Sequence, residues 1–208
     1  MRKQLQTGWV VVFSLLLMFS MQLARAGASG PDDLIKQTSD KVLKTLKDNK
    51  AAFDKDPELI YTMVNEIILP HLDFRAMSKL ALGKNWRTAN AQQQERFVDA
   101  FRTMLVRTYS KSLTTYTDQK IEFLPYAPPE EGKITVTVKT QVIQDNGPAI
   151  PIDYRLRIKD NEWKVYDIQI DGISLVTNYR NSFASDIRKV GMDGLIEKLD
   201  DKNRKTSS

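Results

Sequence analysis

The side chains that catalyse reactions or bind metals are scarce in this sequence. His71 is its only histidine, and the 208 residues include no cysteine. A catalytic triad needs a histidine beside its nucleophile, but His71 follows Pro70 at the end of a predicted helix, and no Gly-x-Ser-x-Gly motif is present. Without cysteine the chain also lacks thiolate ligands and the usual ligand set of a zinc site. We therefore interpret His71 as a surface or capping residue and expect neither a metal nor a cofactor.

Three carboxylates beside the predicted sheet are the remaining candidates for catalysis. Asp153, Asp167 and Asp171 lie on or next to predicted strands, and a pair of carboxylates is the machinery of most glycoside hydrolases. Each also has a simpler interpretation, because Asp171 begins a turn, Asp153 lies on the polar face of a strand, and Asp167 pairs with an arginine or caps backbone amides. The sequence favours a binding protein, and an exported enzyme using Asp153 or Asp167 is the alternative.

Residues 1–26 have the pattern of a secretory signal peptide that is removed from the mature protein. Two basic residues precede an apolar segment from Trp9 to Leu23, and a small-x-small cleavage sequence ends at Ala26. The apolar segment is short for a membrane-spanning helix, which makes an uncleaved anchor the weaker alternative. No later segment reaches membrane-spanning length, so we expect a soluble protein of the periplasm.

Removal of this peptide changes the charge of the chain. The whole sequence has a formal net charge of +5, from 31 basic and 26 acidic residues. The peptide carries Arg2, Lys3 and Arg25, so 28 basic residues stay in the mature protein and the net charge falls to +2. No uninterrupted basic run is left to follow a phosphate backbone. We therefore expect no nucleic-acid partner.

Four segments in the first half of the mature chain have the spacing of amphipathic helices. They are residues 32–46, 57–69, 74–82 and 91–116. Before the longest of them, Asn90 and Gln93 form a capping-box pattern. Its apolar face is rich in large side chains, and an ordinary packed core is the simplest explanation of such a face.

The second half predicts antiparallel strands, because the apolar period changes from helical to two. The predicted strands are residues 120–124, 134–142, 150–158 and 163–170. Turn signals follow the last three of them, at Asn146-Gly147, Asp160-Asn161 and Asp171-Gly172. A sheet with one apolar face needs a cover, which the flanking helices supply. We expect one α+β domain over residues 27–200 and a polar, disordered tail at 201–208.

The segment of residues 163–183 connects this sheet to a helix that folds back over it. Ser174 is placed to accept hydrogen bonds from the first free amides of that helix. The apolar stripe of the helix consists of Leu175, Tyr179, Phe183 and Ile187. A last helix is expected at residues 193–199. Such a roof over a sheet is either a filled core or the wall of a cavity, and periodicity does not separate the two.

Several short segments occur in a recognisable order and spacing over nearly the whole mature chain. They are Leu69-Pro-His-Leu-Asp-Phe74, Leu82-Gly-Lys-Asn-Trp86, Gln93 through Phe97, Phe101, Leu105-Val-Arg-Thr-Tyr109, Trp163-Lys-Val-Tyr-Asp167, Gly172-Ile-Ser-Leu175, Asn178-Tyr-Arg180 and Gly191-Met-Asp-Gly-Leu195. In these segments the chain resembles the toluene-tolerance family, the MlaC family of periplasmic phospholipid-binding proteins. Asn90-Ala91 and Ser182 depart from the Thr-Pro and Gln that the family often has.

This resemblance implies a fold similar to the nuclear-transport-factor-2 type, in which helices wrap a curved antiparallel sheet of about four strands and enclose an apolar cavity. It implies that the cavity takes phospholipid acyl chains and leaves the headgroup near solvent. It also implies two partners, an inner-membrane ABC transport complex and an outer-membrane lipoprotein–porin complex, between which lipid is carried to maintain outer-membrane lipid asymmetry. The direction of transport, the number of chains, the headgroup preference, the docking surfaces and the oligomeric state stay open.

The resemblance and the periodicity together give an expected set of cavity-lining residues. They are Met63, Ile67, Met77, Phe97, Phe101, Met104 and Leu105 on the helices, Val136, Val138, Tyr154, Leu156, Ile168 and Ile170 on the sheet, and Val176, Tyr179 and Phe183 on the roof. Arg155, Arg157 and Arg180 are candidates for contact with the lipid phosphate, although solvated surface positions explain each of them better. An envelope adaptor with a filled core is the alternative to a lipid carrier.

Overall fold

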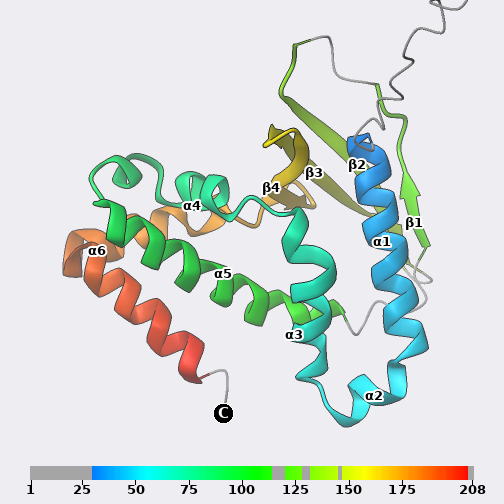
Figure 1. Cartoon of the computed structure of the whole chain (residues 1–208), viewed down its shortest axis with the longest axis horizontal. Coiled ribbons are helices and arrows are strands. Elements are labelled where there is room, and N and C mark those ends of the chain that lie inside the picture. Colours follow the sequence, from blue (N-terminus) through cyan, green and yellow to red (C-terminus); the bar gives the residue numbers. More distant parts are fainter. Residues whose placement is uncertain (1–29, 114–119, 128–131, 145–146, 206–208) are drawn as a thin grey trace, which may run out of the picture.

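The structure is a computed structural model that describes residues 30–113, 120–127, 132–144 and 147–205. Its helical elements are α1 (Pro31–Asp48), α2 (Lys50–Lys55), α3 (Leu59–Met63), η1 (Val64–Ile68), η2 (Leu69–His71), α4 (Phe74–Leu82), η3 (Gly83–Arg87), α5 (Ala91–Leu113), η4 (Thr177–Tyr179) and α6 (Arg180–Lys205). Its strands are β1 (Lys120–Phe123), β2 (Thr135–Ile143), β3 (Ile150–Lys159), β4 (Glu162–Ile170) and β5 (Ile173–Ser174). The helices come first, a meander of strands follows, and α6 comes last (Figure 1). The predicted signal peptide at residues 1–26 lies outside the described residues.

The five strands form one antiparallel sheet in the order β1-β2-β3-β4-β5. The predicted α+β class is therefore confirmed, and the four predicted strands match β1 to β4 to within about one residue at each end. A register shift between Arg155 and Leu156 interrupts the β3–β4 pairing. The fifth strand has two residues, so its pairing with β4 was too short to leave a period in the sequence.

Two tight turns connect the last three strands, and both use left-handed backbone. Asp160 and Asn161 have φ of 51° and 62°, and Asp171 and Gly172 have φ of 50° and 75°. Two consecutive residues with positive φ characterise the hairpin turns that match strand twist, and Asp, Asn and Gly tolerate this region best. Both predicted turns are confirmed. The predicted turn at Asn146-Gly147 lies partly outside the described residues.

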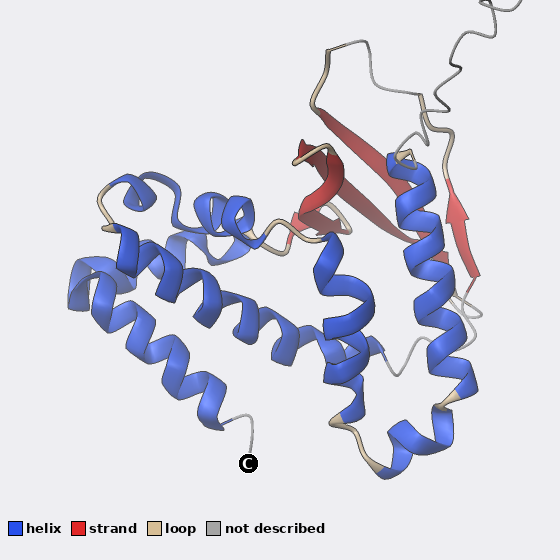
Figure 2. Cartoon of the chain, viewed as in Figure 1, coloured by secondary structure: helices blue, strands red, loops and turns tan. Residues whose placement is uncertain are grey.

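Helix α1 lies along one face of the sheet (Figure 2). Ile35 of α1 packs there with Val138, Leu156 and Val165. Val165 also forms an isolated parallel bridge with Leu72, which attaches the connection between η2 and α4 to the β4 side of the sheet. Both the first helix and the approach to α4 are thus fixed against the same strands.

A second core lies between α4, α5 and α6, to one side of the sheet (Figure 1). Its centre is aromatic: the ring centroids of Phe97 and Phe101 are 5.5 Å apart, and Phe183 meets each of them edge-on at 5.6 Å. The Tyr179 ring stacks on Phe183 at 5.4 Å. Aromatic pairs at these separations stabilise a core beyond their buried area.

Two predicted helix caps are confirmed. At the start of α5, Asn90 Oδ1 accepts from the Gln93 N–H at 2.8 Å, and Gln93 Oε1 accepts from the Asn90 N–H at 3.1 Å. These reciprocal bonds satisfy amides that have no partner within the helix. Ser174 Oγ accepts from the Thr177 N–H at 2.9 Å and so begins the turn η4 that leads into α6.

The predicted helix over residues 57–69 is not a regular α-helix. Only its first part is α-helical as α3, and it continues as the π-helix η1 and the 3-10 helix η2. Pro70 explains the change, because it has no N–H to donate to the Glu66 carbonyl and its ring crowds that turn. The sequence marked Pro70 as a stop but not the irregular turns before it.

The tail predicted from residue 201 is wrong over residues 201–205, which are helical in α6. Asn203 Nδ2 donates to the Ala100 carbonyl at 2.9 Å, and this bond attaches the end of α6 to α5. Residues 206–208 lie outside the described part. Gly191, with φ of 74°, breaks the helical backbone within α6. It separates the roof helix from the helix that we expected at residues 193–199, as left-handed glycines commonly do.

Candidate functional site

A cavity of about 520 Å³ lies between the sheet and the helices α1, α4 and α5. It is lined by Thr38, Ser39, Val42, Leu43, Leu46, Val64, Ile68, Leu69, Leu72, Phe74, Met77, Leu105, Val106, Tyr109, Ser110, Ser112, Leu113, Ile121, Val142, Ile150, Ile152, Tyr154, Ile168, Ile170 and Leu175. Most of these side chains are aliphatic, and none of the described lining residues carries a formal charge. The volume lies within the range of about 300–1,000 Å³ that small-molecule pockets span. The space suits an apolar ligand.

The sheet forms its wall through the alternation of strand side chains. Ile150, Ile152 and Tyr154 of β3 line the cavity at every second residue, and Ile168 and Ile170 of β4 repeat this spacing. Side chains two residues apart on a strand point to the same face. A local sequence period therefore produces a continuous apolar surface across two strands.

Helix α5 divides its apolar residues between two settings. In its first half, Phe97 and Phe101 lie in the core with α4 and α6. In its last two turns, Val106, Tyr109 and Leu113 line the cavity. Positions three or four apart share one side of a helix. The helix thus fills a core along one part of its length and bounds an open space along another.

Five of the predicted lining residues line this cavity. They are Met77, Leu105, Tyr154, Ile168 and Ile170. They come from α4, α5, β3 and β4, so the fold brings together side chains that are up to 93 positions apart in the sequence, from Met77 to Ile170. That these side chains contact a ligand stays a prediction.

The other predicted lining residues do not line the cavity. Phe97, Phe101, Met104, Val176, Tyr179 and Phe183 pack in the core of α4, α5 and α6; Val136, Val138 and Leu156 pack beneath α1; and Met63 and Ile67 pack between α1 and α3. Phe97, Phe101 and Leu156 have no exposed surface. Periodicity locates the apolar side of an element, but it does not tell whether a neighbour closes on that side.

Sequence reasoning missed the wall that α1 supplies. Val42, Leu43 and Leu46 line the cavity together with Thr38 and Ser39 one turn earlier. The helical spacing of these residues was visible in the sequence and indicated an amphipathic helix. Nothing in the spacing tells which surface such a helix will cover, so the signal was present without its assignment.

Hydroxyl groups are the polar component of this region. Burial raises the pKa of Tyr154, and the neighbouring side chains of Thr140 and Ser39 oppose this by hydrogen bonding that lowers it. The Tyr109 and Tyr179 hydroxyls lie 3.4 Å apart at the junction of the cavity and the aromatic core. Burial raises the pKa of Tyr179, and Tyr109 raises it further. Because their pKa values are raised, Tyr154 and Tyr179 are neutral at physiological pH, so this region offers dipoles without charge.

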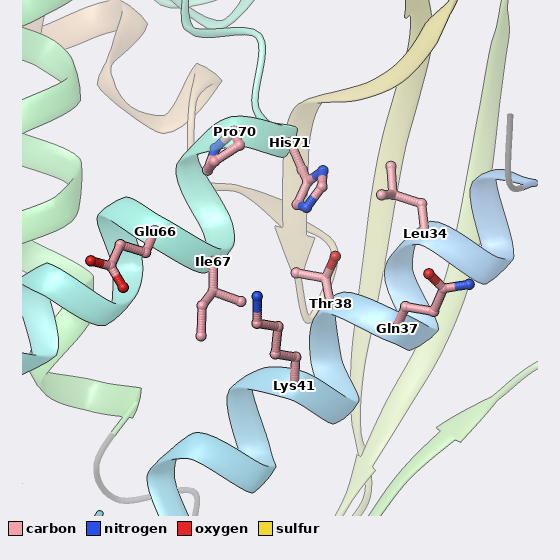
Figure 3. A pocket seen from close by; sticks show the side chains of 8 residues that line it. All are labelled: Leu34, Gln37, Thr38, Lys41, Glu66, Ile67, Pro70 and His71. Atoms are coloured by element: carbon pink, nitrogen blue, oxygen red, sulfur yellow. The ribbon is translucent and has the colours of Figure 1, made fainter.

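A smaller pocket of about 180 Å³ lies between α1 and the segment η1–η2 (Figure 3). It is lined by Leu34, Gln37, Thr38, Lys41, Glu66, Ile67, Pro70 and His71. The side chains of Lys41 and His71 extend into the space between the two elements (Figure 3). With three ionisable residues and a third of the volume, this pocket suits small polar species and differs in kind from the large cavity, with which it shares Thr38.

His71 is expected to destabilise the fold when it becomes protonated. Burial lowers the pKa of His71 below its ordinary value of 6.5, Lys164 and Lys41 lower it further, and Glu162 opposes them. A lowered pKa means that the folded protein prefers the neutral imidazole, so this contribution is complete above pH 6.5 and is lost as the pH falls through the folded pKa. The free energy of unfolding, measured by urea denaturation at pH 7 and at pH 5.5, is expected to fall less between these two pH values in His71→Gln than in the wild type. An equal fall in both proteins would contradict this assignment.

The three candidate carboxylates have structural roles or surface positions. Asp167 is fully buried, Ser174 Oγ donates to its Oδ1 at 2.7 Å, and Arg155 Nη1 lies 3.5 Å from its Oδ2. The expected pairing of Asp167 with an arginine is confirmed. Asp171 lies in an exposed turn, and Asp153 is half-buried on β3. The Ser174 hydroxyl donates to Asp167 and at the same time accepts from the Thr177 N–H at the start of η4. Asp167 thus holds the capping hydroxyl of Ser174 in place.

The three arginines considered for a lipid phosphate are all engaged with the protein. Besides the pair of Arg155 with Asp167, Arg157 Nε lies 3.6 Å from Asp73 Oδ2. Arg180 donates to the Leu80 carbonyl from Nε at 2.9 Å and from Nη2 at 2.6 Å. Asp73 in turn accepts from the first turn of α4. These bonds assign the arginines to fixing α4, the sheet and α6 relative to one another.

Two further features bear on the kind of site that this is. Within the described ranges, no group of three or more His, Asp or Glu side chains has the geometry to hold a metal ion. Over the same ranges, no helix combines the length and the hydrophobicity that crossing a membrane requires. The large cavity, with its aliphatic walls and neutral hydroxyls, is therefore the main candidate site in the described structure.

Comparison with known proteins identifies a family and similar sequences. The sequence model of a family described as "MlaC protein" matches residues 36–201. The chain is 26% identical over 199 residues to the intermembrane phospholipid transport system binding protein MlaC of Haemophilus influenzae, and the match covers 94% of this chain and 92% of that protein. It is 30% identical over 180 residues to the toluene tolerance protein ttg2D of Pseudomonas putida, with 86% and 83% covered.

A solved structure extends the likeness to three dimensions. The phospholipid-binding protein of Ralstonia solanacearum, solved in complex with a phospholipid, matches with a TM-score of 0.78 and 31% sequence identity. The match covers 86% of this chain and 100% of that chain. The likeness is thus to a whole fold and not to a shared substructure.

Proposed function

Because this chain belongs to the MlaC family, we propose that it is a soluble periplasmic carrier that holds the acyl chains of a phospholipid in its large cavity. The observation that carries the proposal is the apolar space of about 520 Å³, whose described lining residues are all uncharged. A relative named as a phospholipid transport binding protein and a similar protein solved with a phospholipid support it. The predicted signal peptide at residues 1–26 agrees with a periplasmic location.

A carrier is required because acyl chains are costly to expose to water. A two-chain phospholipid has roughly 30 methylenes, each contributing about 0.8 kcal/mol on burial. Free lipid is therefore far too rare in water to cross an aqueous compartment at a useful rate. The protein supplies an apolar surface for this transfer and performs no bond chemistry, so we infer that it is not an enzyme. The buried and paired Asp167 is better suited to holding the fold than to the catalytic role considered as an alternative.

The volume of the cavity bears on how lipid enters. A whole two-chain lipid demands a cavity near the upper end of common pockets, about 1,000 Å³, which exceeds the 520 Å³ found here. We infer that the walls separate as the chains enter. Side chains that are unbranched or branched only at Cγ change rotamer more readily than β-branched ones. The wall residues of this kind include Met77, Leu43, Leu46, Leu105 and Leu113.

Delivery of lipid requires partners in both membranes. We propose that the carrier exchanges phospholipid with an inner-membrane ABC transport complex and with an outer-membrane lipoprotein–porin complex, and so maintains the lipid asymmetry of the outer membrane. The name of the Haemophilus influenzae relative, which assigns it to an intermembrane transport system, supports exchange between two membranes. Transfer of labelled lipid from the carrier to each reconstituted complex tests this part, and transfer to neither would contradict it.

Mass spectrometry of an organic extract tests lipid binding itself. The mature protein, exported in a bacterial host and purified without detergent, is expected to release phospholipid in stoichiometric amount. An exported protein of similar size without an apolar cavity, purified in parallel, controls for contaminating lipid. An extract without phospholipid from well-folded protein would contradict the proposal and favour an envelope adaptor with a filled core.

A further inference from the structure

Ser110, on the cavity side of α5, has a buried hydroxyl without a hydrogen-bonding partner in the described structure. Its side chain lines the cavity and is 2% exposed. Leaving a buried hydroxyl unpaired costs free energy, and buried polar groups in folded proteins are nearly always paired. The position of Ser110 therefore indicates a partner that enters the cavity.

The surrounding helix does not satisfy this hydroxyl in the observed arrangement. Thr108, two residues earlier, donates from Oγ1 to the Met104 carbonyl at 2.7 Å. Ser110 makes no corresponding hydrogen bond to the carbonyl of Val106, four residues earlier. Val106 and Leu113 flank Ser110 on the same side of the helix and also line the cavity. The Ser110 hydroxyl thus lies between two aliphatic side chains at the cavity wall.

Two other hydroxyls of the wall have polar neighbours within the protein. The side chains of Thr140 and Ser39 act on the Tyr154 hydroxyl and lower its pKa against the effect of burial, and the Tyr109 hydroxyl lies 3.4 Å from that of Tyr179. These groups can meet their hydrogen-bonding needs within the protein. The Ser110 hydroxyl has no such partner among the described residues, so it needs an atom of a ligand to hydrogen-bond with it.

The chemistry of a phospholipid limits what that ligand atom is. Methylenes neither donate nor accept hydrogen bonds, and a phosphate is costly to bring to a wall whose described residues carry no charge. The ester carbonyls are neutral acceptors at the boundary between the chains and the headgroup. They are the acceptors that a buried hydroxyl in an apolar wall can reach without a charge leaving water.

Resting on the proposed function, we propose that Ser110 Oγ–H donates a hydrogen bond to an ester carbonyl of the bound phospholipid. This contact sets the depth of the lipid, with its ester linkage level with the last turns of α5. It also makes Ser110 a specificity-determining residue for diacyl lipids. A dialkyl ether lipid of the same length lacks the carbonyls and leaves the hydroxyl unpaired.

A competition between two lipids that differ only in these carbonyls tests the assignment. Delipidated mature protein is incubated with vesicles that contain equal amounts of dipalmitoyl phosphatidylglycerol and its dihexadecyl ether analogue, then repurified and extracted. Mass spectrometry of the extract is expected to show about fivefold enrichment of the diester in the wild type, which is the value of one net hydrogen bond. This readout requires no variant and so does not depend on the folding of one.

Three variants connect the preference to the Ser110 hydroxyl. Ser110→Ala is expected to take up both lipids about equally, and Ser110→Thr, which keeps a hydroxyl, is expected to retain the preference. Ser78→Ala is the matched control, because Ser78 is equally buried and has no described partner but lies on α4 outside the cavity lining. It is expected to behave as the wild type.

The outcomes separate this inference from the proposed function. Equal uptake of the two lipids by the wild type, or an unchanged preference in Ser110→Ala, would overturn the role of Ser110 and favour a hydroxyl that turns back to the Val106 carbonyl. Lipid would then still be bound, and the proposed function would stand. Absence of both lipids from folded wild-type protein would overturn the proposed function and this inference with it.

Discussion

Ile170→Asp is expected to remove phospholipid from a protein that still folds. Ile170 lines the cavity and is only partly buried, so its side chain faces the ligand space at the end of β4. Keeping an aspartate protonated at pH 7, about three units above its ordinary pKa, costs about 4 kcal/mol. A cost of this size lowers lipid affinity by about a thousandfold. The lipid-to-protein ratio in organic extracts, measured by mass spectrometry, is expected to fall from stoichiometric to background.

Ile173→Asp is the matched control for this change. Ile173 pairs with Ile170 across the β4–β5 ladder, and it is 60% exposed. The same substitution on the paired strand therefore places its charge in water, where it costs little. This variant is expected to keep its lipid, and circular dichroism is expected to show folded protein for both. Loss of lipid from both variants, or from neither, would contradict the placement of Ile170 in the cavity wall.

Phe101→Asp is expected to prevent folding instead of emptying the cavity. Phe101 is fully buried, and its ring lies 5.5 to 5.8 Å from the rings of Phe97, Phe183 and Tyr179. Loss of a buried phenyl ring costs about 3–5 kcal/mol, and the buried carboxyl group adds a cost of similar size. The sum is comparable with the whole stability of a typical domain, about 5–15 kcal/mol. Tryptophan fluorescence in urea and the yield of soluble protein measure this loss.

Phe101→Leu separates packing from charge at the same position. Leucine keeps most of the apolar volume but loses the ring contacts, so this variant is expected to fold with a loss of about 1–2 kcal/mol. Its lipid content is expected to equal that of the wild type. A folded Phe101→Asp protein that lacks lipid would instead place Phe101 on the cavity wall, where periodicity alone had put it.

The contrast between Ile170 and Phe101 marks the limit of prediction from this sequence. Both residues lie on apolar stripes, and both were predicted to line a cavity. The strands around Ile170 were predicted to within about one residue, as were the turns at Asp160-Asn161 and Asp171-Gly172. These features were predictable because alternation along a strand and positive φ in a turn are set by residues next to one another in the chain.

Helix α5 illustrates what could not be predicted. Its largely apolar side runs from Phe97 to Leu113, yet α6 closes on the first part and the cavity opens beside the second. Contact between α5 and α6 depends on residues about a hundred positions away, such as Asn203, which bonds to the Ala100 carbonyl. The extent of α6 was itself underestimated, because a polar sequence at residues 201–205 does not reveal that one of its side chains reaches another helix.

The unpaired hydroxyl of Ser110 is a further example. In the sequence it is one polar residue within an apolar stripe, and local rules predict that it bonds to the carbonyl four residues back. Its burial, its lack of a described partner and its place on the cavity wall exist only after α1, α5 and the sheet have come together. A specificity-determining role for Ser110 was therefore not derivable from spacing.

The sequence by itself determined the α+β class, the antiparallel strands with their turns, the two helix caps and the resemblance that led to a lipid carrier. Each of these depends on the period of side chains along one element or on short segments of fixed order. The tertiary structure alone decided which apolar surfaces touch and which stay apart. A cavity is the space left where distant elements do not meet, and no local period records it. For this reason Phe97 and Leu156 pack in filled cores, while Val42 and Ile170 bound the space for a ligand.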